Sequence, residues 1–491
     1  MDPEKILWSD TSWYAERFEK SAAALVAVGQ TVAGDTAAET AEFQRLFTFV
    51  AEASPEHFAK LWNDPMAYYW VRRAVHFLAA VRGAPLGRIE VAYCAYTGAA
   101  GPLEALRIHL ADFSRFALAL AILSGRELAF AEPYTTALPL ALPGTQLVVG
   151  GSGRLSIHGV TTSYIDATYK GECIKLPIAD DAPSASTPHI APCPFVDLEG
   201  MRILLNPALF RLPGIGLSSE WTEPASDFQK LHSGALIDAL SLVSSFQPQS
   251  IAQFQQGLRS LALKPMREGT FSSLSSSELP GAFICSVPCD RYELAATLIH
   301  EFHHNRLFHI EENGAFFEEG GEDPIDGENH YSPWRDGPRP LHGLFHALYV
   351  YLPVFRFWSA VVCRGELAGI QLAYAKDQLG RIPFQLRIGV NQLRRHARFT
   401  SFGSLLFEQM AAETIAAERQ ACALGISLDL PATSLRANGT LRSVVGGTDA
   451  RELTIGETLR DHLEKADRLG ECEQERQLLD CQLRSGHTPR R

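Results

Sequence analysis

The sequence predicts an α+β protein that is predominantly α-helical, with an antiparallel β region inserted between two helical parts. Apolar residues recur at helical spacing before residue 140 and again from 225 to about 425. From 141 to 224 the spacing shortens to alternation between Gly, Pro and Asp turns, which is typical of strands and hairpins. We therefore expect an N-terminal helical lobe, a β-rich region and a second helical region.

Each region depends on particular segments. The N-terminal lobe, 1–140, contains three stretches with helical periodicity: FQRLFTFVAEA, FAKLWNDPMAYYWVRRAVHFLAAV and LEALRIHLADFSRFALALAIL. The β-rich region, 141–224, includes SGRLSIHGVTTSYIDATYKGECIKLP and GMRILLNPALFRL. The last region, 426–491, starts like a loop and ends in a charged tract, which favours a terminal helix with a frayed tail. With 491 residues, 46% of them hydrophobic, the chain can bury a large core and divide into two or three lobes.

Composition narrows the function classes. A net charge of −12 and a pI near 5.8 argue against a nucleic-acid-binding surface. The start of the chain is acidic where a signal peptide is basic and apolar, and runs such as FALALAILSG are about half as long as a membrane span. We expect a cytoplasmic protein without a membrane segment. The 9 cysteines, an odd number, predict free thiols.

An HExxH motif marks the second helical region as the catalytic one. It is made by His300, Glu301 and His304. Asp290 followed by Glu293 predicts a capping box, so a helix of about five turns should begin near residue 291. Two imidazoles four positions apart on a helix point from one face and can share a divalent metal, with Glu301 beside it. The alternative is a histidine-rich helix face that binds no metal.

Two imidazoles bind zinc or ferrous iron weakly, so a third ligand is needed. A metzincin protease is excluded, because Leu307 and Ile310 stand where that family has Gly and His. A gluzincin protease takes a glutamate from a downstream helix, and the following segment offers three candidates. We expect solvated surface charge there instead, because this acidic segment is broken by glycines and makes a poor platform for a ligand. The three glutamates are Glu318, Glu319 and Glu322.

A second histidine pair follows in the segment YSPWRDGPRPLHGLFHALYVY. Pro340 suits the first turn of a helix, on which His342 and His346 are again four residues apart. Two such helices facing each other form a metal site between them. We choose His346 as the third ligand, because it lies one turn deeper among apolar residues, and assign His342 to the surroundings of the site or to the substrate. The alternative for either histidine is a core residue that bonds to a neighbour.

Two arginines precede this second helix. Arg335 and Arg339 each carry a planar guanidinium that can bind a carboxylate through two hydrogen bonds. The carboxylate could belong to a co-substrate that chelates the metal with its other end, or to a peptide C-terminus. The structural alternative is a pairing with Asp336 or with a carbonyl of the same loop.

Two segments together resemble the bacterial HExxH peptide-modification family. They are GAFICSVPCDRYELAATLIHEFHHNRLF and, further along, YSPWRDGPRPLHGLFHALYVYLPVFRFW. The resemblance covers about residues 280–360, with weaker likeness elsewhere, and Gly337 departs from it where an acidic residue is common. Members of this family are described as 2-oxoglutarate-dependent β-hydroxylases of ribosomally made natural-product precursor peptides.

The resemblance implies an Fe(II)-dependent oxygenase that uses 2-oxoglutarate and O2 and hydroxylates a side-chain β-carbon of a precursor peptide. Arg339 and Arg335 would then anchor 2-oxoglutarate, Trp334 would wall the pocket, and Glu301 would support the metal site instead of activating water. The alternative from the motif alone is a zinc metallopeptidase, in which Glu301 is the general base. A third interpretation is a peptide-binding scaffold with a structural metal. The oligomeric state stays open.

Overall fold

A computed structural model of the chain describes most of the first 426 residues and two short strands beyond them. The described ranges are 13–32, 38–136, 140–145, 147–149, 154–178, 190–215, 228–266, 272–287, 290–321, 330–334, 339–426, 431–432 and 453–454. The fold is a mostly helical α+β fold, so the predicted class is confirmed. Most of the predicted C-terminal region lies outside the described residues.

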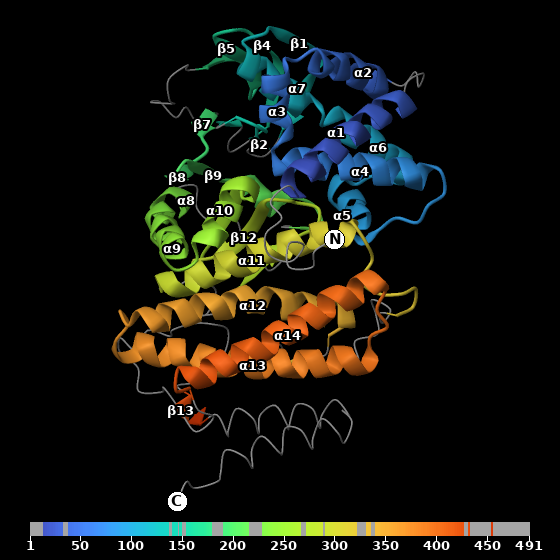
Figure 1. Ribbon diagram of the computed structural model, residues 1–491. Coiled ribbons are helices and arrows are strands. Elements are labelled where there is room, and N and C mark those ends of the chain that lie inside the picture. Colours follow the sequence, from blue (N-terminus) through green and yellow to red (C-terminus); the bar gives the residue numbers. More distant parts are fainter. Residues whose placement is uncertain are drawn as a thin grey trace, which may run out of the picture.

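Helices make up the N-terminal lobe (Figure 1). Their starts follow local sequence signals: Ser54 and Asp64 each accept a backbone N–H as N-caps, and a proline follows each of them. Around Trp70, aromatic rings form the centre of the lobe's core, which continues onto the neighbouring sheet. The helices are α1 (Trp13–Val32), α2 (Ala38–Ala51), α3 (Pro55–Trp62), α4 (Pro65–Val81), α5 (Arg88–Thr97), α6 (Pro102–Ala111) and α7 (Ser114–Ser124).

Two antiparallel sheets follow, as the alternating pattern predicts. The larger has the strand order β1-β4-β5-β6 and packs against α7, and the smaller has the order β2-β3-β7. The first strand begins before residue 140, so the end of the region predicted to be helical was wrong. The strands are β1 (Leu128–Thr136), β2 (Leu140–Ala141), β3 (Leu147–Val149), β4 (Leu155–Val160), β5 (Tyr164–Tyr169), β6 (Glu172–Pro177) and β7 (Ile190–Pro192).

A third, mixed sheet lies in the middle of the molecule, in the order β11-β12-β10-β9-β8. It consists of β8 (Phe195–Leu198), β9 (Met201–Leu205), β10 (Ser260–Lys264), β11 (Ser273–Ser275) and β12 (Ala282–Ser286), and the 3-10 helix η2 (Pro207–Arg211) follows β9. The purely helical prediction after residue 225 was therefore wrong at three strands. Two of these, β10 and β12, pair in parallel and are buried almost throughout, so they show no alternation that would distinguish a strand.

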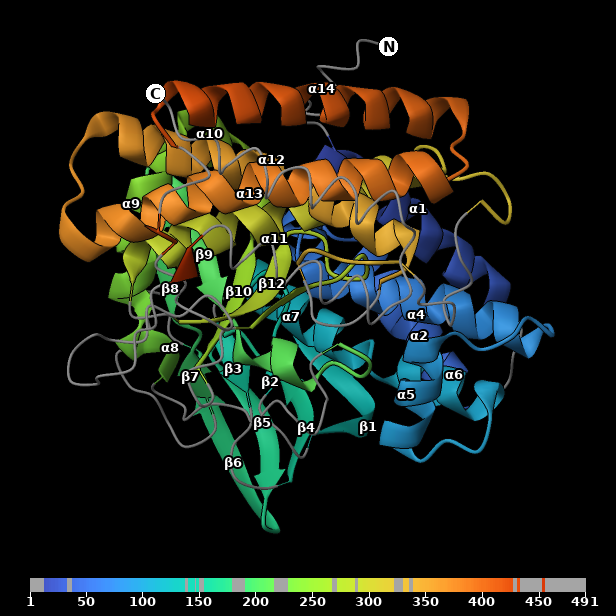
Figure 2. The same ribbon diagram turned by 90° about the horizontal axis from the view of Figure 1, so that it is seen from below.

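The second helical region places one helix between the mixed sheet and a helical layer. Helix α11 packs on β11 and β12 and also on α12, while α13 and α14 pack on α12 (Figures 1 and 2). The largest apolar core runs through these layers. The helices are α8 (Phe228–Leu231), α9 (Ser233–Phe246), α10 (Pro248–Gly257), α11 (Arg291–Glu312), α12 (Leu341–Arg364), α13 (Gly369–His396) and α14 (Ser401–Ala423).

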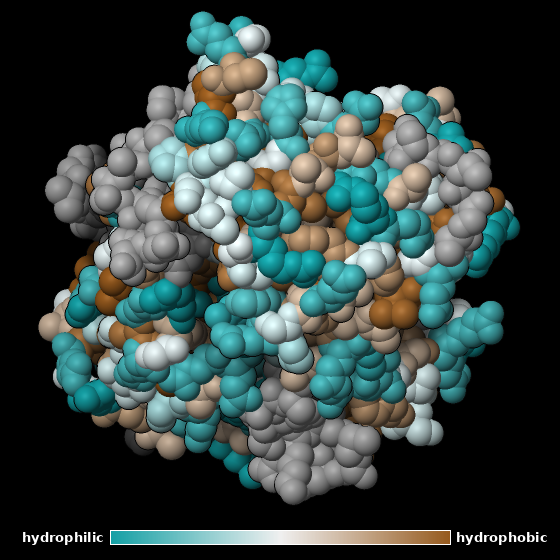
Figure 3. Space-filling model, turned by 90° about the horizontal axis from the view of Figure 1, so that it is seen from above, coloured by the Kyte–Doolittle hydropathy of each residue, from teal (hydrophilic) through white to brown (hydrophobic). Residues whose placement is uncertain are grey.

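Helix α12 is, among the described residues, the one helix long and apolar enough to cross a membrane, and 78% of its most apolar window is buried inside the protein. Such burial is compatible with a soluble protein, in which α12 is a core helix. The face seen from above carries apolar side chains scattered among polar ones (Figure 3). The cysteines in the described part of the chain are free, as predicted. Near the C-terminus β13 (Pro431–Ala432) pairs with β14 (Leu453–Thr454).

Candidate metal centre between two helices

Helix α11 begins where the sequence predicts. The carboxylate of Asp290 accepts hydrogen bonds from the backbone N–H groups of Tyr292 and Glu293, and the helix runs for 22 residues. The side chain of Glu293 accepts a hydrogen bond from the Tyr374 hydroxyl of α13 at 2.5 Å. This contact ties the first turn of α11 to another helix. The histidine-bearing helix is thus anchored at its start by its own cap and by tertiary packing.

Helix α12 lies antiparallel to α11, and the residue contacts follow from that direction. His300 faces Tyr351, His304 faces His346, and Glu311 faces His342. Pro340 precedes the first helical residue as the N-cap and is not itself in the first turn, a shift of one position from the prediction. The two histidine pairs therefore meet across one helix interface, as the sequence suggested.

Two nitrogens of the HExxH pair converge. His300 Nε2 and His304 Nε2 lie 3.2 Å apart. Two nitrogens bound to one zinc ion at about 2.0–2.1 Å in tetrahedral geometry are separated by roughly 3.3 Å, so this spacing fits shared coordination. A metal-free pair at the same distance requires one ring to donate its proton to the other.

The third predicted ligand approaches the other side of His304. His346 Nδ1 lies 3.1 Å from His304 Nδ1, whereas His300 faces the Nε2 atom of the same ring. The three histidines therefore form a row and do not converge on one point. His346 is 4% exposed, and its Nε2 atom is buried without a hydrogen bond. An unpaired buried nitrogen of this kind is available to a ligand.

A residue that the sequence analysis missed completes the row. The carboxylate of Glu311 accepts a hydrogen bond from His342 at 2.7 Å and lies 3.8 Å from His346 Nε2. Glu311, His342 and His346 offer ligand atoms within 4.8 Å of one another. Glu311 follows His304 by seven residues, or two helical turns, and this spacing on the same helix face was the available signal.

The glutamates considered after the helix lie elsewhere. Glu318 and Glu319 are exposed, in agreement with the solvated surface charge that we expected, and Glu322 lies outside the described residues. The glutamate beside the histidines thus comes from α11 itself. Its side chain points from the same helix face as the HExxH imidazoles, whereas a gluzincin takes its glutamate from a second helix.

Burial keeps the imidazoles of the row neutral. Loss of solvent, with the Arg339 charge as the second cause, lowers the pKa of His300 to about 3. Burial also lowers the pKa of His346 to about 4 and that of His304 well below its usual value. Burial alone would raise the pKa of Glu311, but its contacts with His342 and His346 outweigh this and lower the pKa to about 2. Neutral imidazoles beside a charged carboxylate are the protonation states that bind a divalent cation.

Glu301 is held on the sheet side of the helix. Ser273 of β11 donates a hydrogen bond to Glu301 Oε1 at 2.5 Å, and the same oxygen lies 3.9 Å from His300 Nε2. Burial raises the pKa of this carboxyl group, although the serine contacts oppose the shift. Glu301 therefore lies near the His300 nitrogen that faces His304, beyond hydrogen-bond distance, and its hydrogen-bonding capacity is partly used by the sheet.

The segment before α12 contributes a ring and a charge. Trp334 stacks on Tyr351 with ring centroids 5.6 Å apart, and the Tyr351 ring contacts His300 at 5.0 Å. Arg339 bonds to the carbonyl of Gly343 at 3.3 Å, and its charge acts on the histidine row. The structure thus connects Trp334 to His300 through Tyr351 and places the Arg339 charge near the histidines. Arg335 lies outside the described residues.

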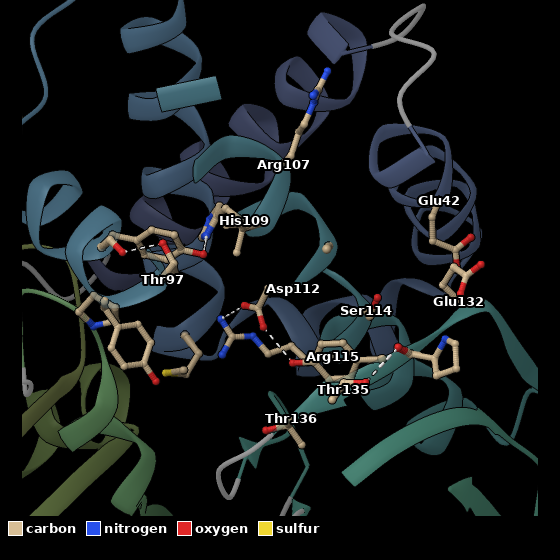
Figure 4. A pocket seen from close by; sticks show the side chains of 18 of the residues that line it. Glu42, Thr97, Arg107, His109, Asp112, Ser114, Arg115, Glu132, Thr135 and Thr136 are labelled. Atoms are coloured by element: carbon tan, nitrogen blue, oxygen red, sulfur yellow. Dashed lines mark hydrogen bonds and ion pairs between the residues drawn. The ribbon is translucent and has the colours of Figure 1, made fainter. Parts of the chain in front are cut away.

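A large cavity lies in the N-terminal lobe, and none of the predicted site residues lines it. It measures about 1350 Å³ and is lined by α2, α4 to α7, β1 and η2. Figure 4 shows the Asp112 carboxylate in its wall joined to Arg115 at 2.7 Å, and Tyr134 donates to the same carboxylate. The periodicity of the lobe gave no signal for this cavity, because its walls come from separate elements.

Comparison with known proteins does not identify the chain. No protein-family model matches it, and no curated protein is significantly similar to it. The donor set is therefore the basis for a functional argument. Buried neutral imidazoles at ligand spacing, a His346 nitrogen that makes no hydrogen bond and the adjacent Glu311 carboxylate fit a divalent transition metal such as iron or zinc.

Proposed function

We propose that this protein is an Fe(II)- and 2-oxoglutarate-dependent oxygenase that hydroxylates a side-chain β-carbon of a ribosomally made precursor peptide in the cytoplasm. The observation that carries the proposal is the convergence of His300 and His304 at 3.2 Å beside His346, with the Arg339 charge acting on all three rings. The resemblance to the HExxH peptide-modification family supports the same reaction class.

The donor set assigns a role to each histidine. His300 and His304 would hold the metal through Nε2. His346 would supply the third nitrogen from the facing helix once its side chain has reoriented, because in this structure it faces the other nitrogen of His304. A site with three protein ligands leaves positions for a bidentate co-substrate and for O2. When bound, iron and 2-oxoglutarate supply the oxidative chemistry that places a hydroxyl group on the substrate carbon, with succinate and CO2 as the other products.

Residues around the metal would bind the co-substrate and exclude water from the site. Arg339 would pair with the distal carboxylate of 2-oxoglutarate, because a guanidinium binds a carboxylate through two hydrogen bonds. The stacked rings of Trp334 and Tyr351 would shield one side of the site from water. Glu301, hydrogen-bonded to Ser273, would place its carboxylate beside the metal, because it lies on the Nε2 side of the His300 ring.

The assay uses anaerobically purified protein with iron, 2-oxoglutarate, O2 and a candidate precursor peptide. We expect succinate to form and the peptide mass to rise by one oxygen atom. Arg339→Gln should raise the KM for 2-oxoglutarate, whereas Arg364→Gln, which removes a surface ion pair with Glu366, should not. An unchanged peptide without succinate would refute the proposal.

A zinc metallopeptidase is the alternative, and two observations favour it. Glu301 lies beside His300 as a general base would, and Glu311 offers a carboxylate near the histidines. A peptide backbone cleaved with zinc alone, without 2-oxoglutarate, would establish this function. Tight peptide and metal binding with neither reaction would instead indicate a binding scaffold.

A further inference from the structure

A small cavity lies where the N-terminal lobe meets the end of α11. It measures about 280 Å³ and is lined by residues of α1 and α4 together with Glu312 of α11. Its polar lining from α1 comes from Arg17, Lys20 and Ser21, which share one helix face because they are three and four residues apart. Two helices and the last turn of a third thus present side chains to one partly open volume.

Positive charge is concentrated around this cavity in an otherwise acidic chain. Arg17 and Lys20 line it from α1 and Arg72 lines it from α4, whereas Glu312 is the one carboxylate among the described lining residues. Two of these cations are also held in place. The Arg17 and Arg72 guanidiniums lie 4.8 and 5.9 Å from the centre of the Tyr68 ring.

The three cations that line the cavity have hydrogen-bond donors that their present partners do not use. Arg17 donates from Nε and Nη2 to Glu312, at 3.1 and 2.6 Å. Arg72 donates to Glu278 at 3.4 Å, and Glu278 does not line the cavity. Lys20 has a long contact with Asn313 at 3.5 Å. The carboxylates therefore do not use the full donor capacity of these three cations.

Two buried polar atoms at this site have no partner. Arg17 is 0% exposed and Ser21 is 4% exposed, yet Arg17 Nη1 and Ser21 Oγ make no hydrogen bond. Leaving a buried donor unpaired costs stability, so such groups in native proteins usually mark a bound ligand, ion or water. An unpaired guanidinium nitrogen and an unpaired hydroxyl beside further cations are the donors that an oxyanion requires.

We propose that this cavity binds a small phosphate-bearing anion. Donors from α1 and from α4 line parts of the volume, which suits an anion with acceptor oxygens on more than one side. The volume lies just below that of cavities for drug-sized ligands, so inorganic phosphate or a small phosphate monoester fits it. Glu312 directly follows Glu311, so the anion would sit beside the last turn of the histidine-bearing helix. This site is independent of the reaction proposed above.

The test is a titration of the full-length protein with inorganic phosphate. Calorimetry measures the binding, and thermal unfolding measures the Tm with and without phosphate. We expect saturable binding and a higher Tm than in chloride of equal ionic strength. Lys20→Gln and Ser21→Ala should each weaken binding about tenfold, since each removes one donor to the anion. Lys60→Gln, at a surface lysine paired with Glu56, should bind like the unaltered protein.

Glycerol phosphate separates the two ligand types. Tighter binding of this monoester than of phosphate would identify a phosphate-bearing molecule as the ligand, and equal or weaker binding would identify the free ion. Ser21→Ala also guards against a folding artefact: without ligand it should unfold at the same or a higher temperature, because it removes an unpaired buried hydroxyl. No saturable binding of phosphate, or equal affinity in all variants, would overturn the proposal.

Discussion

Gly389→Ala tests whether helix α13 sets the position of Trp334. Gly389 lies inside α13, and a Cβ atom added there would meet Cη2 of Trp334 at 2.6 Å. Carbon atoms pack at about 3.5–4.0 Å, so the indole must move by roughly 1 Å or more. Alanine stabilises a helix interior by about 1 kcal/mol relative to glycine, and overpacking costs about 1–3 kcal/mol. We therefore expect a net loss of about 1 kcal/mol.

The control is Gly234→Ala in the first turn of α9, where an added Cβ meets nothing within 4 Å. Urea unfolding gives the free energy of unfolding of each variant. In the difference between the two values the helix-propensity gain largely cancels, and the cost of the clash, about 1–3 kcal/mol, remains. The same clash should disturb the contacts from Trp334 through Tyr351 to His300 and so weaken metal binding by Gly389→Ala alone. If both variants stabilise the protein equally and bind metal equally well, the indole is not held by this close approach.

Three further outcomes are expected. His346→Ala should lose most of the affinity for iron or zinc in equilibrium titrations, and His342→Ala should lose less; the reverse order would mean that His342 is the ligand. Ser273→Ala should lower the free energy of unfolding by about 0.5–1.5 kcal/mol, because it removes one of the serine donors to the buried Glu301 carboxyl; unchanged urea unfolding would contradict this. Burial lowers the pKa of His109 from 6.5 to about 3, so unfolding takes up a proton in this window and stability falls as the pH drops below 6.5. His109→Gln should reduce that pH dependence by about 1.4 kcal/mol per pH unit, and an unaltered dependence in acid melts would show that His109 is not buried in its neutral form.

The sequence predicted individual helices better than the arrangement of strands. The start of α11 follows from Asp290, whose carboxylate bonds to backbone groups two and three residues away. The strands β10 and β12 follow from no such local signal. They pair in parallel within a buried sheet, so both of their faces are apolar and their pattern resembles a buried helix segment.

Some features of the candidate site also follow from the sequence, and others only from the tertiary structure. The sequence by itself determined that His300 and His304 share a helix face and that a second pair lies on a following helix, because these relations depend on residues one turn apart. Only the tertiary structure decided that α12 runs antiparallel to α11, which sets His346 against the far nitrogen of His304 and brings Glu311 to His342. Contacts of this kind depend on how two helices pack over their whole length, and no short stretch of sequence contains that information.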